Sequence, residues 1–363
     1  MAQKKSPLTW LCTFGEIGFD KVILRTAQDH WIRPFADTAG VRGRSKSIRL
    51  QRGMCDFAAE HSFDAATKRL REHYGFELGA SAFREVTLEN ARRARQKVET
   101  EYAQSFRELP TGAPSTVLAE ADGSMLCTVL AGLARDAKRP RHWQEMRVVA
   151  AQKQGSAQTF YAATFGEVQA VGQRWGHVAR QAGRALESPI QVLCDGAEWI
   201  AIQARATFGE DASILTDFYH VSESLAAAAP SCQPESPEPW RHARQNELKT
   251  GGSETVIALL AAHREPEATP EDQAPVRAAH RYLSNRRDTF DYAAALVAEL
   301  PIGSGLIESA HKHVLQKRSK IPGAIWLPES IEAITQRRIL RANSRWDELW
   351  APRRLTPLFP TFF

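Results

Sequence analysis

The sequence predicts a mixed α/β protein in which a layer of strands and helices follows a helical region. Between residues 114 and 220, apolar runs of strand length alternate with helical stretches, a pattern typical of an α/β layer built on a mixed sheet. Residues 46–110 and 221–300 have helical periodicity instead. The chain has 363 residues, which is enough for two or three domains.

The composition is that of a globular protein with a modest basic excess. The formal net charge is +5 at pH 7, which favours an acidic partner such as nucleic acid. The five cysteines lie far apart without a C-x-x-C pair, which argues against a zinc ribbon and against a disulfide framework. Because no apolar run is long enough for a signal peptide or a membrane span, the expected location is the cytoplasm, on the nucleoid if the protein binds DNA.

Two small regions are expected before the α/β layer. Residues 1–45 contain alternating apolar runs such as K-V-I-L-R and predict a small β-rich module. Residues 46–110 predict three helices, the second capped by Ser62 and ended by Gly75, the third starting near Ser81. Two helices joined by a short glycine-bearing turn indicate a helix-turn-helix, although an ordinary helical bundle with a solvated basic face has the same pattern. The third helix carries the arginines predicted to bind DNA, which are Arg84, Arg92 and Arg93.

The α/β core is expected over residues 114–220, after a linker at 109–115. Apolar runs predict strands over 116–123, 125–130, 145–152 and 159–165. The elements expected next are a helix over 165–184, a strand over 190–196, a helix over 197–206 and a strand over 213–220.

The core is predicted to be interrupted by a helical insertion over residues 221–300. A proline-rich stretch at 230–240 within it is interpreted as a loop. The region 301–350 is expected to hold a helix with Glu308 and a further basic helix over 331–350, and residues 351–363 form a tail.

Three carboxylates stand out by their positions. Asp122 is expected at the end of the strand V-L-A-E-A and Asp195 at the end of Q-V-L-C, each followed by a glycine. Such a glycine lets the chain turn and lets a ligand approach the backbone, although Asp-Gly is also a common turn. Glu308 follows the glycine-bearing turn P-I-G-S-G. Three carboxylates suit Mg²⁺, with Mn²⁺ as a substitute, and two-metal phosphoryl transfer.

Further polar residues accompany these acids. Asp217 could cap the helix that follows it, with His220 close by, or the two could orient a phosphate near the metals. His311 and His313 are interpreted either as DNA contacts or as plain helix-face residues. The basic residues behind Glu308 that are predicted to contact phosphates are Lys312, Lys317, Arg318 and Lys320.

Three of these motifs resemble a known family. V-L-C-D-G-A-E-W-I, D-F-Y-H with Glu223 shortly after, and P-I-G-S-G-L-I-E-S-A-H-K-H-V-L-Q-K-R are similar to motifs of the ISKra-type insertion-sequence transposases. These transposases belong to the Mutator-like group of DDE transposases. The resemblance covers residues 50–350, and the last motif is the most specific. Many relatives also carry a cysteine-rich zinc ribbon near the amino terminus, which this chain lacks.

The resemblance implies an RNase H-like catalytic core with an all-helical insertion. It implies that Asp122, Asp195 and Glu308 are catalytic and bind Mg²⁺. Asp217 and His220 match the D-x-x-H signature of the group and are therefore included in the catalytic site. The Arg-rich helix falls where these transposases carry a helix-turn-helix for terminal-repeat DNA.

The expected function is that of a transposase. It would bind double-stranded terminal-repeat DNA, cleave it by metal-dependent hydrolysis and join the freed 3′-hydroxyl to target DNA. Synapsis of two ends makes a homodimer or a higher oligomer the default expectation. A catalytically inactive, transposase-derived DNA-binding regulator is a first alternative, which the presence of all three acids disfavours. An RNase H-like DNA nuclease or resolvase is a second, which the Arg-rich helices and the long insertion disfavour.

Overall fold

The computed structural model describes residues 3–25, 30–34, 46–103, 108–112, 114–130 and 140–350. The predicted tail over 351–363 lies outside the described residues, as does part of the predicted amino-terminal module. The chain divides into two compact units. The first comprises residues 1–98, 129–140 and 314–363, and the second comprises residues 99–128 and 141–313.

The first unit begins with the β-rich module that the sequence predicted. Strands β1 (Gln3–Cys12) and β2 (Gly15–Arg25) form an antiparallel hairpin, and the short β3 (Trp31–Ile32) pairs with β2. The strands predicted from K-V-I-L-R are therefore confirmed, since this run lies within β2.

Three helices follow in the same unit, also as predicted. They are α2 (Ile48–Glu60), α3 (Phe63–Tyr74) and α4 (Ala80–Ala103). The Ser62 hydroxyl accepts a hydrogen bond from the Ala65 amide at 3.2 Å and so caps α3. Gly75 ends that helix with a φ of +74°, a conformation that glycine adopts without strain. Buried side chains of the three helices share one core, which includes Leu50, Leu70 and Phe83.

The last long helix of this unit differs from the predicted one. We expected a basic helix over 331–350, but α14 (Pro328–Ala342) ends earlier and a short 3₁₀ turn, η4 (Trp346–Leu349), follows it. Every residue of α14 from Ser330 to Leu340 is buried, including Arg337 and Arg338. The charges are accommodated internally: Arg338 donates to the Val314 carbonyl at 2.6 Å and pairs with Glu60 at 2.9 Å. The helix is therefore a core element and not a solvated basic face.

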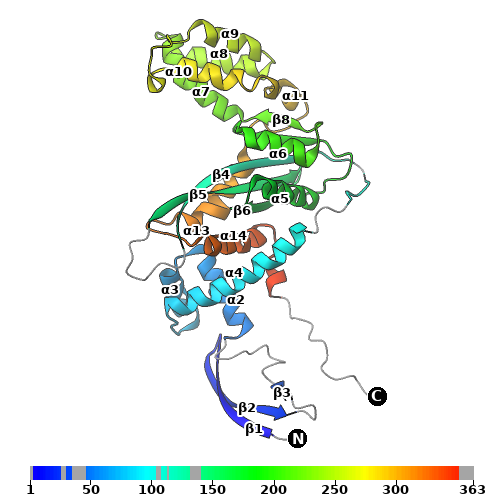
Figure 1. Cartoon of the computed structure of the whole chain (residues 1–363), viewed down its shortest axis with the longest axis vertical. Coiled ribbons are helices and arrows are strands. Elements are labelled where there is room, and N and C mark those ends of the chain that lie inside the picture. The colour runs from blue at the N-terminus through cyan, green and yellow to red at the C-terminus, as the bar shows by residue number, and fades with distance from the viewer. Residues whose placement is uncertain are drawn as a thin grey trace. The chain divides into compact units, whose positions relative to one another are not determined.

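The second unit is built on a five-stranded sheet of order β6-β5-β4-β7-β8. The strands are β4 (Val117–Val129), β5 (Arg141–Lys153), β6 (Thr159–Thr164), β7 (Ile190–Cys194) and β8 (Ser213–Thr216). Strand β7 pairs in parallel with β4 and with β8, whereas β5 and β6 are antiparallel. Helices α5 (Val168–Gln181) and α6 (Glu198–Phe208) cover one face of the sheet (Figure 1). The predicted mixed α/β class is confirmed.

One predicted strand boundary is wrong. We expected separate strands over 116–123 and 125–130 with Asp122 at the end of the first, but β4 continues through Asp122 and Gly123 to Val129. The reason for the glycine is the neighbouring strand. A side chain at position 123 would collide with Glu145 of β5, so Gly123 provides room for that carboxylate and does not form a turn.

The insertion is helical, as predicted, and its core is continuous with β7 and β8. Its helices are α7 (Phe218–Cys232), α8 (Pro237–Lys249), α9 (Ser253–Ala262), α10 (Pro275–Ser284) and α11 (Tyr292–Val297). They bury residues such as Leu225, Leu260 and Leu283 against Leu193 and Leu215 of the sheet. The proline-rich loop predicted over 230–240 is shorter than expected, because Pro230 lies inside α7 and Pro237 occupies the first turn of α8, where its missing N–H costs nothing.

The segment after the insertion returns to the sheet as three short helical pieces. These are α12 (Gly305–Ser309), a π-helical stretch η3 (Ala310–Gln316) and α13 (Lys317–Ser319). We expected a single α-helix. A π-helical stretch inside an α-helix is uncommon and often marks a functional site. None of the helices in the described part of the chain is long and apolar enough to cross a membrane.

Candidate functional site

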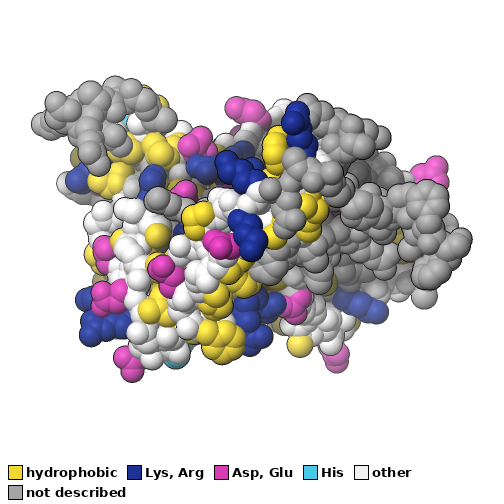
Figure 2. Space-filling model, turned by 90° about the horizontal axis from the view of Figure 1, so that it is seen from below, with side chains coloured by type: hydrophobic (Ala, Val, Ile, Leu, Met, Phe, Trp, Pro, Cys, Tyr) yellow, Lys and Arg dark blue, Asp and Glu magenta, His cyan; other side chains and the backbone are white. Residues whose placement is uncertain are grey.

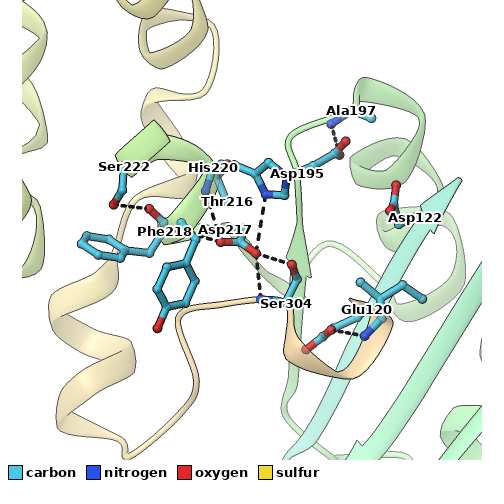
Figure 3. A network of polar contacts seen from close by, with 12 residues as sticks. Glu120, Asp122, Asp195, Ala197, Thr216, Asp217, Phe218, His220, Ser222 and Ser304 are labelled. Atoms are coloured by element: carbon cyan, nitrogen blue, oxygen red, sulfur yellow. Dashed lines mark hydrogen bonds and ion pairs between the residues drawn. The ribbon is translucent and has the colours of Figure 1, made fainter. Parts of the chain in front are cut away.

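Two of the predicted acids lie side by side on the sheet. Strand β4 pairs in parallel with β7, and partners differ by 73 in number, from Val117 with Ile190 to Glu120 with Leu193. The same offset places Asp122 level with Asp195, which directly follows β7. Figure 3 shows both aspartates, Asp122 within β4 and Asp195 just after β7. Parallel strands therefore bring together two acids that lie 73 residues apart in the sequence.

The Asp122 carboxylate is oriented by its own backbone and by a histidine. Its Oδ1 accepts a hydrogen bond from the Gly123 amide at 2.6 Å, and its Oδ2 lies 3.2 Å from Nε2 of His311. His311 is buried, and neither of its ring nitrogens has a partner with hydrogen-bond geometry among the described residues. The contact is thus an ion pair when the imidazole is protonated. The interpretation of His311 as a DNA contact is wrong, because its ring is buried against Asp122.

The Asp195 carboxylate lies in the turn between β7 and α6. Its Oδ1 accepts a hydrogen bond from the Ala197 amide at 2.9 Å (Figure 3). The turn requires the next residue to be glycine, because Gly196 has a φ of +88°.

Glu308 comes from a different element. It lies on α12 and is exposed to solvent. Among the described residues, no three His, Cys, Asp or Glu side chains are close enough together to hold a metal ion. The donor type, carboxylate oxygen, suits Mg²⁺. In the described structure, Asp122, Asp195 and Glu308 do not form a complete three-ligand site.

A buried carboxylate that sequence reasoning missed connects α12 to the sheet. Glu120 lies on β4 two residues before Asp122, and only 1% of it is exposed. Its Oε2 accepts a hydrogen bond from the Ile307 amide at 2.7 Å, next to Glu308, while its Oε1 is buried without a partner in the described structure (Figure 3). Burial, aided by the nearby charges of Asp217 and Glu308, raises the pKa of Glu120 to about 8. The signal was a lone acid inside the apolar run V-L-A-E-A.

Asp217 has a structural role in the network. It is fully buried, caps α7 by accepting from the Tyr219 amide at 2.6 Å, and also accepts from the Ser304 amide at 2.8 Å. The Ser304 hydroxyl donates to the same carboxylate. Nδ1 of His220 lies 3.6 Å from Oδ2, within ion-pair range but beyond a hydrogen bond. Of the two interpretations left open by the sequence, the structure contains the helix cap, and Asp217 in addition holds the turn that precedes α12.

The glycine at the start of that turn is required by packing. A side chain at Gly303 would collide with the ring of Tyr219, which follows Asp217 on α7. The turn P-I-G-S-G is therefore held from α7 by the Asp217 carboxylate and the Tyr219 ring, and its direction into α12 is fixed.

The basic residues behind Glu308 differ in their exposure. Lys312 and Lys320 are exposed. Lys317 is exposed but pairs with Glu60 at 2.6 Å. Arg318, predicted to contact phosphates, is instead buried: its Nε donates to the Ala58 carbonyl at 3.0 Å, and its guanidinium lies 4.7 Å from the Trp326 ring centre. Burial lowers the pKa of Arg318 to about 10, and its donors do not face solvent.

The predicted DNA-binding arginines of α4 are all on the surface. Arg84, Arg92 and Arg93 are exposed. Later basic residues of the helix are neutralised, since Arg95 pairs with Glu332 at 2.7 Å and Lys97 with Glu348 at 2.5 Å. Figure 2 shows Lys and Arg side chains interspersed with hydrophobic and acidic ones over the described part of the face that it presents. Phosphate contacts from α4 stay a prediction.

The likeness of this chain to known proteins is one of structure and not of sequence. No protein-family model matches the sequence, and no curated protein matches it. Among solved structures, the chain is similar to the Drosophila P element transposase strand transfer complex, with 7% sequence identity and a TM-score of 0.29 over 86% of this chain and 83% of that one. A likeness of this size is too low to assign either a fold or an activity to this chain.

Proposed function

We propose that this protein is a DDE transposase that binds double-stranded DNA at transposon ends, cleaves a phosphodiester and transfers the freed strand to target DNA. The observation that carries the proposal is the register of the neighbouring parallel strands β4 and β7, which brings Asp122 within β4 level with Asp195 directly after β7. Two carboxylates that lie level on adjacent segments of a sheet can share a divalent cation, which is the chemistry that such a reaction requires.

The proposed core fold is RNase H-like. It is supported by the sheet order β6-β5-β4-β7-β8, with β4, β7 and β8 parallel and β5 antiparallel to β6. It is also supported by the position of the helical insertion, which separates β8 from the helix that carries Glu308.

The three acids are proposed to bind the metal. Asp122 and Asp195 would hold Mg²⁺, or Mn²⁺ in its place, and Glu308 on α12 is proposed as a third ligand, which the described structure does not group with the two aspartates. A metal held there would supply activation of the attacking oxygen and stabilisation of the leaving one. Attack of water on the phosphodiester breaks the P–O3′ bond and gives a 3′-hydroxyl and a 5′-phosphate. The 3′-hydroxyl then attacks a phosphodiester of the target, forms a new P–O bond and displaces a 3′-hydroxyl of the target strand. His311, at 3.2 Å from Asp122, restricts the orientation of that carboxylate.

DNA binding in this proposal comes from exposed cations of α4 and of the segment that follows Glu308 in the sequence. Arg84, Arg92 and Arg93 on α4 would contact terminal-repeat DNA, and Lys312 and Lys320 would contact phosphates. Such contacts release counterions, so the affinity would fall steeply with salt. Synapsis of two ends would require a homodimer or a higher oligomer.

A strand-transfer assay tests the proposal. DNA fragments that flank the coding gene, cut to expose 3′-hydroxyl ends, are incubated with supercoiled plasmid in Mg²⁺ or Mn²⁺. We expect joining by the wild type and a loss of more than about 100-fold in Asp122→Asn, Asp195→Asn and Glu308→Gln, because even outer partners of a metal site contribute about 10- to 100-fold. Glu187→Gln removes an exposed carboxylate of the same unit and should join normally. Robust joining by Glu308→Gln would contradict the assignment of Glu308 to the site.

A second candidate function follows from one observation. Glu308 does not group with the aspartates into a metal-binding trio in the described structure. This arrangement favours a transposase-derived regulator that binds DNA without cutting it. Wild-type protein that binds the flanking DNA but neither cleaves nor joins it in either metal would select this alternative.

A further inference from the structure

The helical insertion contacts the backbone of the turn that carries Asp195. The Tyr282 hydroxyl at the end of α10 donates to the Asp195 carbonyl at 2.7 Å. Arg286, one helical turn later, donates to the Gly196 carbonyl through Nε at 2.9 Å and through Nη2 at 2.6 Å. Three hydrogen bonds from the insertion therefore fix the two peptide carbonyls that adjoin the proposed metal ligand.

The donors themselves are held rigidly. The Arg286 guanidinium stacks on the Tyr282 ring at 4.1 Å, and its Nη1 donates to the Tyr282 carbonyl at 2.9 Å. A planar guanidinium that bonds one carbonyl through two nitrogens restricts direction as well as distance.

Gly196 is fitted to this contact. Its φ of +88° favours glycine, and a side chain there would also collide with the Arg286 guanidinium. The sequence suggested that glycine after Asp195 leaves room for a ligand. The structure shows that the group in that space is Arg286.

We propose that Tyr282 and Arg286 are positioning residues, which fix the Asp195 carboxylate beside Asp122 and thereby set the affinity of the site for a divalent cation. The inference rests on the proposed function, since it assigns the insertion a role at the same site. A fixed turn lowers the conformational entropy that Asp195 loses when it binds a metal. Freeing the turn should weaken metal affinity about 10- to 100-fold, the range found for outer partners of metal ligands.

The variants Tyr282→Phe and Arg286→Lys test this role, with Tyr292→Phe as the matched control. Tyr292 is a buried tyrosine of the insertion, and its hydroxyl donates to the Thr216 carbonyl at 2.8 Å, on the strand β8 that pairs with β7, instead of to a carbonyl of the Asp195 turn. Each Tyr→Phe change removes one such hydrogen bond, so the control reproduces the loss of stability without touching Asp195. Arg281→Lys is a second control, because Arg281 also lies on α10 but pairs with Glu271.

Two measurements separate the inference from the proposed function. Hydrogen exchange of the peptide that covers residues 194–197 should rise in both test variants and stay at the wild-type level in both controls. The Mg²⁺ concentration for half-maximal strand transfer should rise about 10- to 100-fold in the test variants alone. Unchanged exchange at 194–197, or an equal Mg²⁺ shift in Tyr292→Phe, would overturn the inference. A wild type without metal-dependent joining would overturn the proposed function and the link to metal. Raised exchange in the test variants would still show that Tyr282 and Arg286 hold the Asp195 turn in place.

Discussion

The Asp217 carboxylate provides the sharpest test of how the insertion and the Glu308 helix are connected. It is fully buried and accepts hydrogen bonds from the Tyr219 amide at 2.6 Å and the Ser304 amide at 2.8 Å, and also from the Ser304 hydroxyl. Asp217→Asn turns one acceptor oxygen into a donor, so either the cap of α7 or the Ser304 contacts lose their partner. A hydrogen bond to a charged group contributes about 1.5–3 kcal/mol, and an unpartnered buried group adds its desolvation penalty. We expect a loss of about 3–5 kcal/mol in the free energy of unfolding.

Urea denaturation followed by circular dichroism measures this loss, with Asp291→Asn as the matched control. Asp291 caps α11 in the same insertion through the Ala294 amide at 3.0 Å, but it is exposed. Loss of an exposed cap costs about 1 kcal/mol. If the two variants lose the same stability within about 0.5 kcal/mol, the reasoning on Asp217 is refuted, because burial and the Ser304 contacts would then contribute nothing.

Three further predictions concern single residues. Burial raises the pKa of Glu120 from 4.5 to about 8, so between these pH values the folded state binds a proton that the unfolded state does not. The free energy of unfolding should therefore fall by up to about 5 kcal/mol as the pH rises from 4.5 to 8. In a pH series of urea denaturations in metal-free buffer, Glu120→Gln should lack this fall. Hydrogen bonds from Arg345 and Lys97 lower the pKa of Glu348 to about 2, so its contribution to the free energy of unfolding is present above pH 4.5 and lost toward pH 2. Because the side chain is 39% exposed, Glu348→Gln should be less stable than the wild type by under about 1 kcal/mol at pH 7. Thermal denaturation of the two proteins should coincide near pH 2. Gly196→Ala should lower the free energy of unfolding by about 1–3 kcal/mol more than Gly183→Ala does. Both glycines have a positive φ, but only a side chain at position 196 would collide with Arg286. Equal melting temperatures of the two variants would contradict that contact.

Local signals in the sequence were sufficient for several elements. Ser62 and Gly75 delimit α3 because a side-chain cap and a left-handed glycine act within a few residues of themselves. The alternating and apolar runs likewise predicted the β-rich module and the α/β class, because the pattern of successive residues shows whether one or both faces of a strand are buried.

Features that depend on distant neighbours were not predictable in the same way. Asp122 was expected to end a strand, yet β4 continues because Gly123 accommodates Glu145 of β5. Arg338 was expected on a basic helix, and its burial with Glu60 as its partner was not predicted. Neither pairing has a local sequence signature, since the partners come from different elements.

The residues of the candidate site likewise differ in whether a local sequence signal indicates them. The aspartates at positions 122 and 195 were found from strand ends and glycines, and the parallel register places them level. Glu120 could have been found as an acid within an apolar run. Tyr282 and Arg286 could not, because they meet the Asp195 turn across 87 and 90 residues of sequence.

Direct binding of a divalent cation is the most immediate test of the central claim that Asp122 and Asp195 form one metal site. Electron paramagnetic resonance of Mn²⁺ titrated into the protein without DNA reports bound metal independently of activity. The account predicts that the wild type and Glu187→Gln bind Mn²⁺ alike, while Asp122→Asn and Asp195→Asn each weaken binding by more than about 100-fold. Wild-type affinity in either aspartate variant would contradict it.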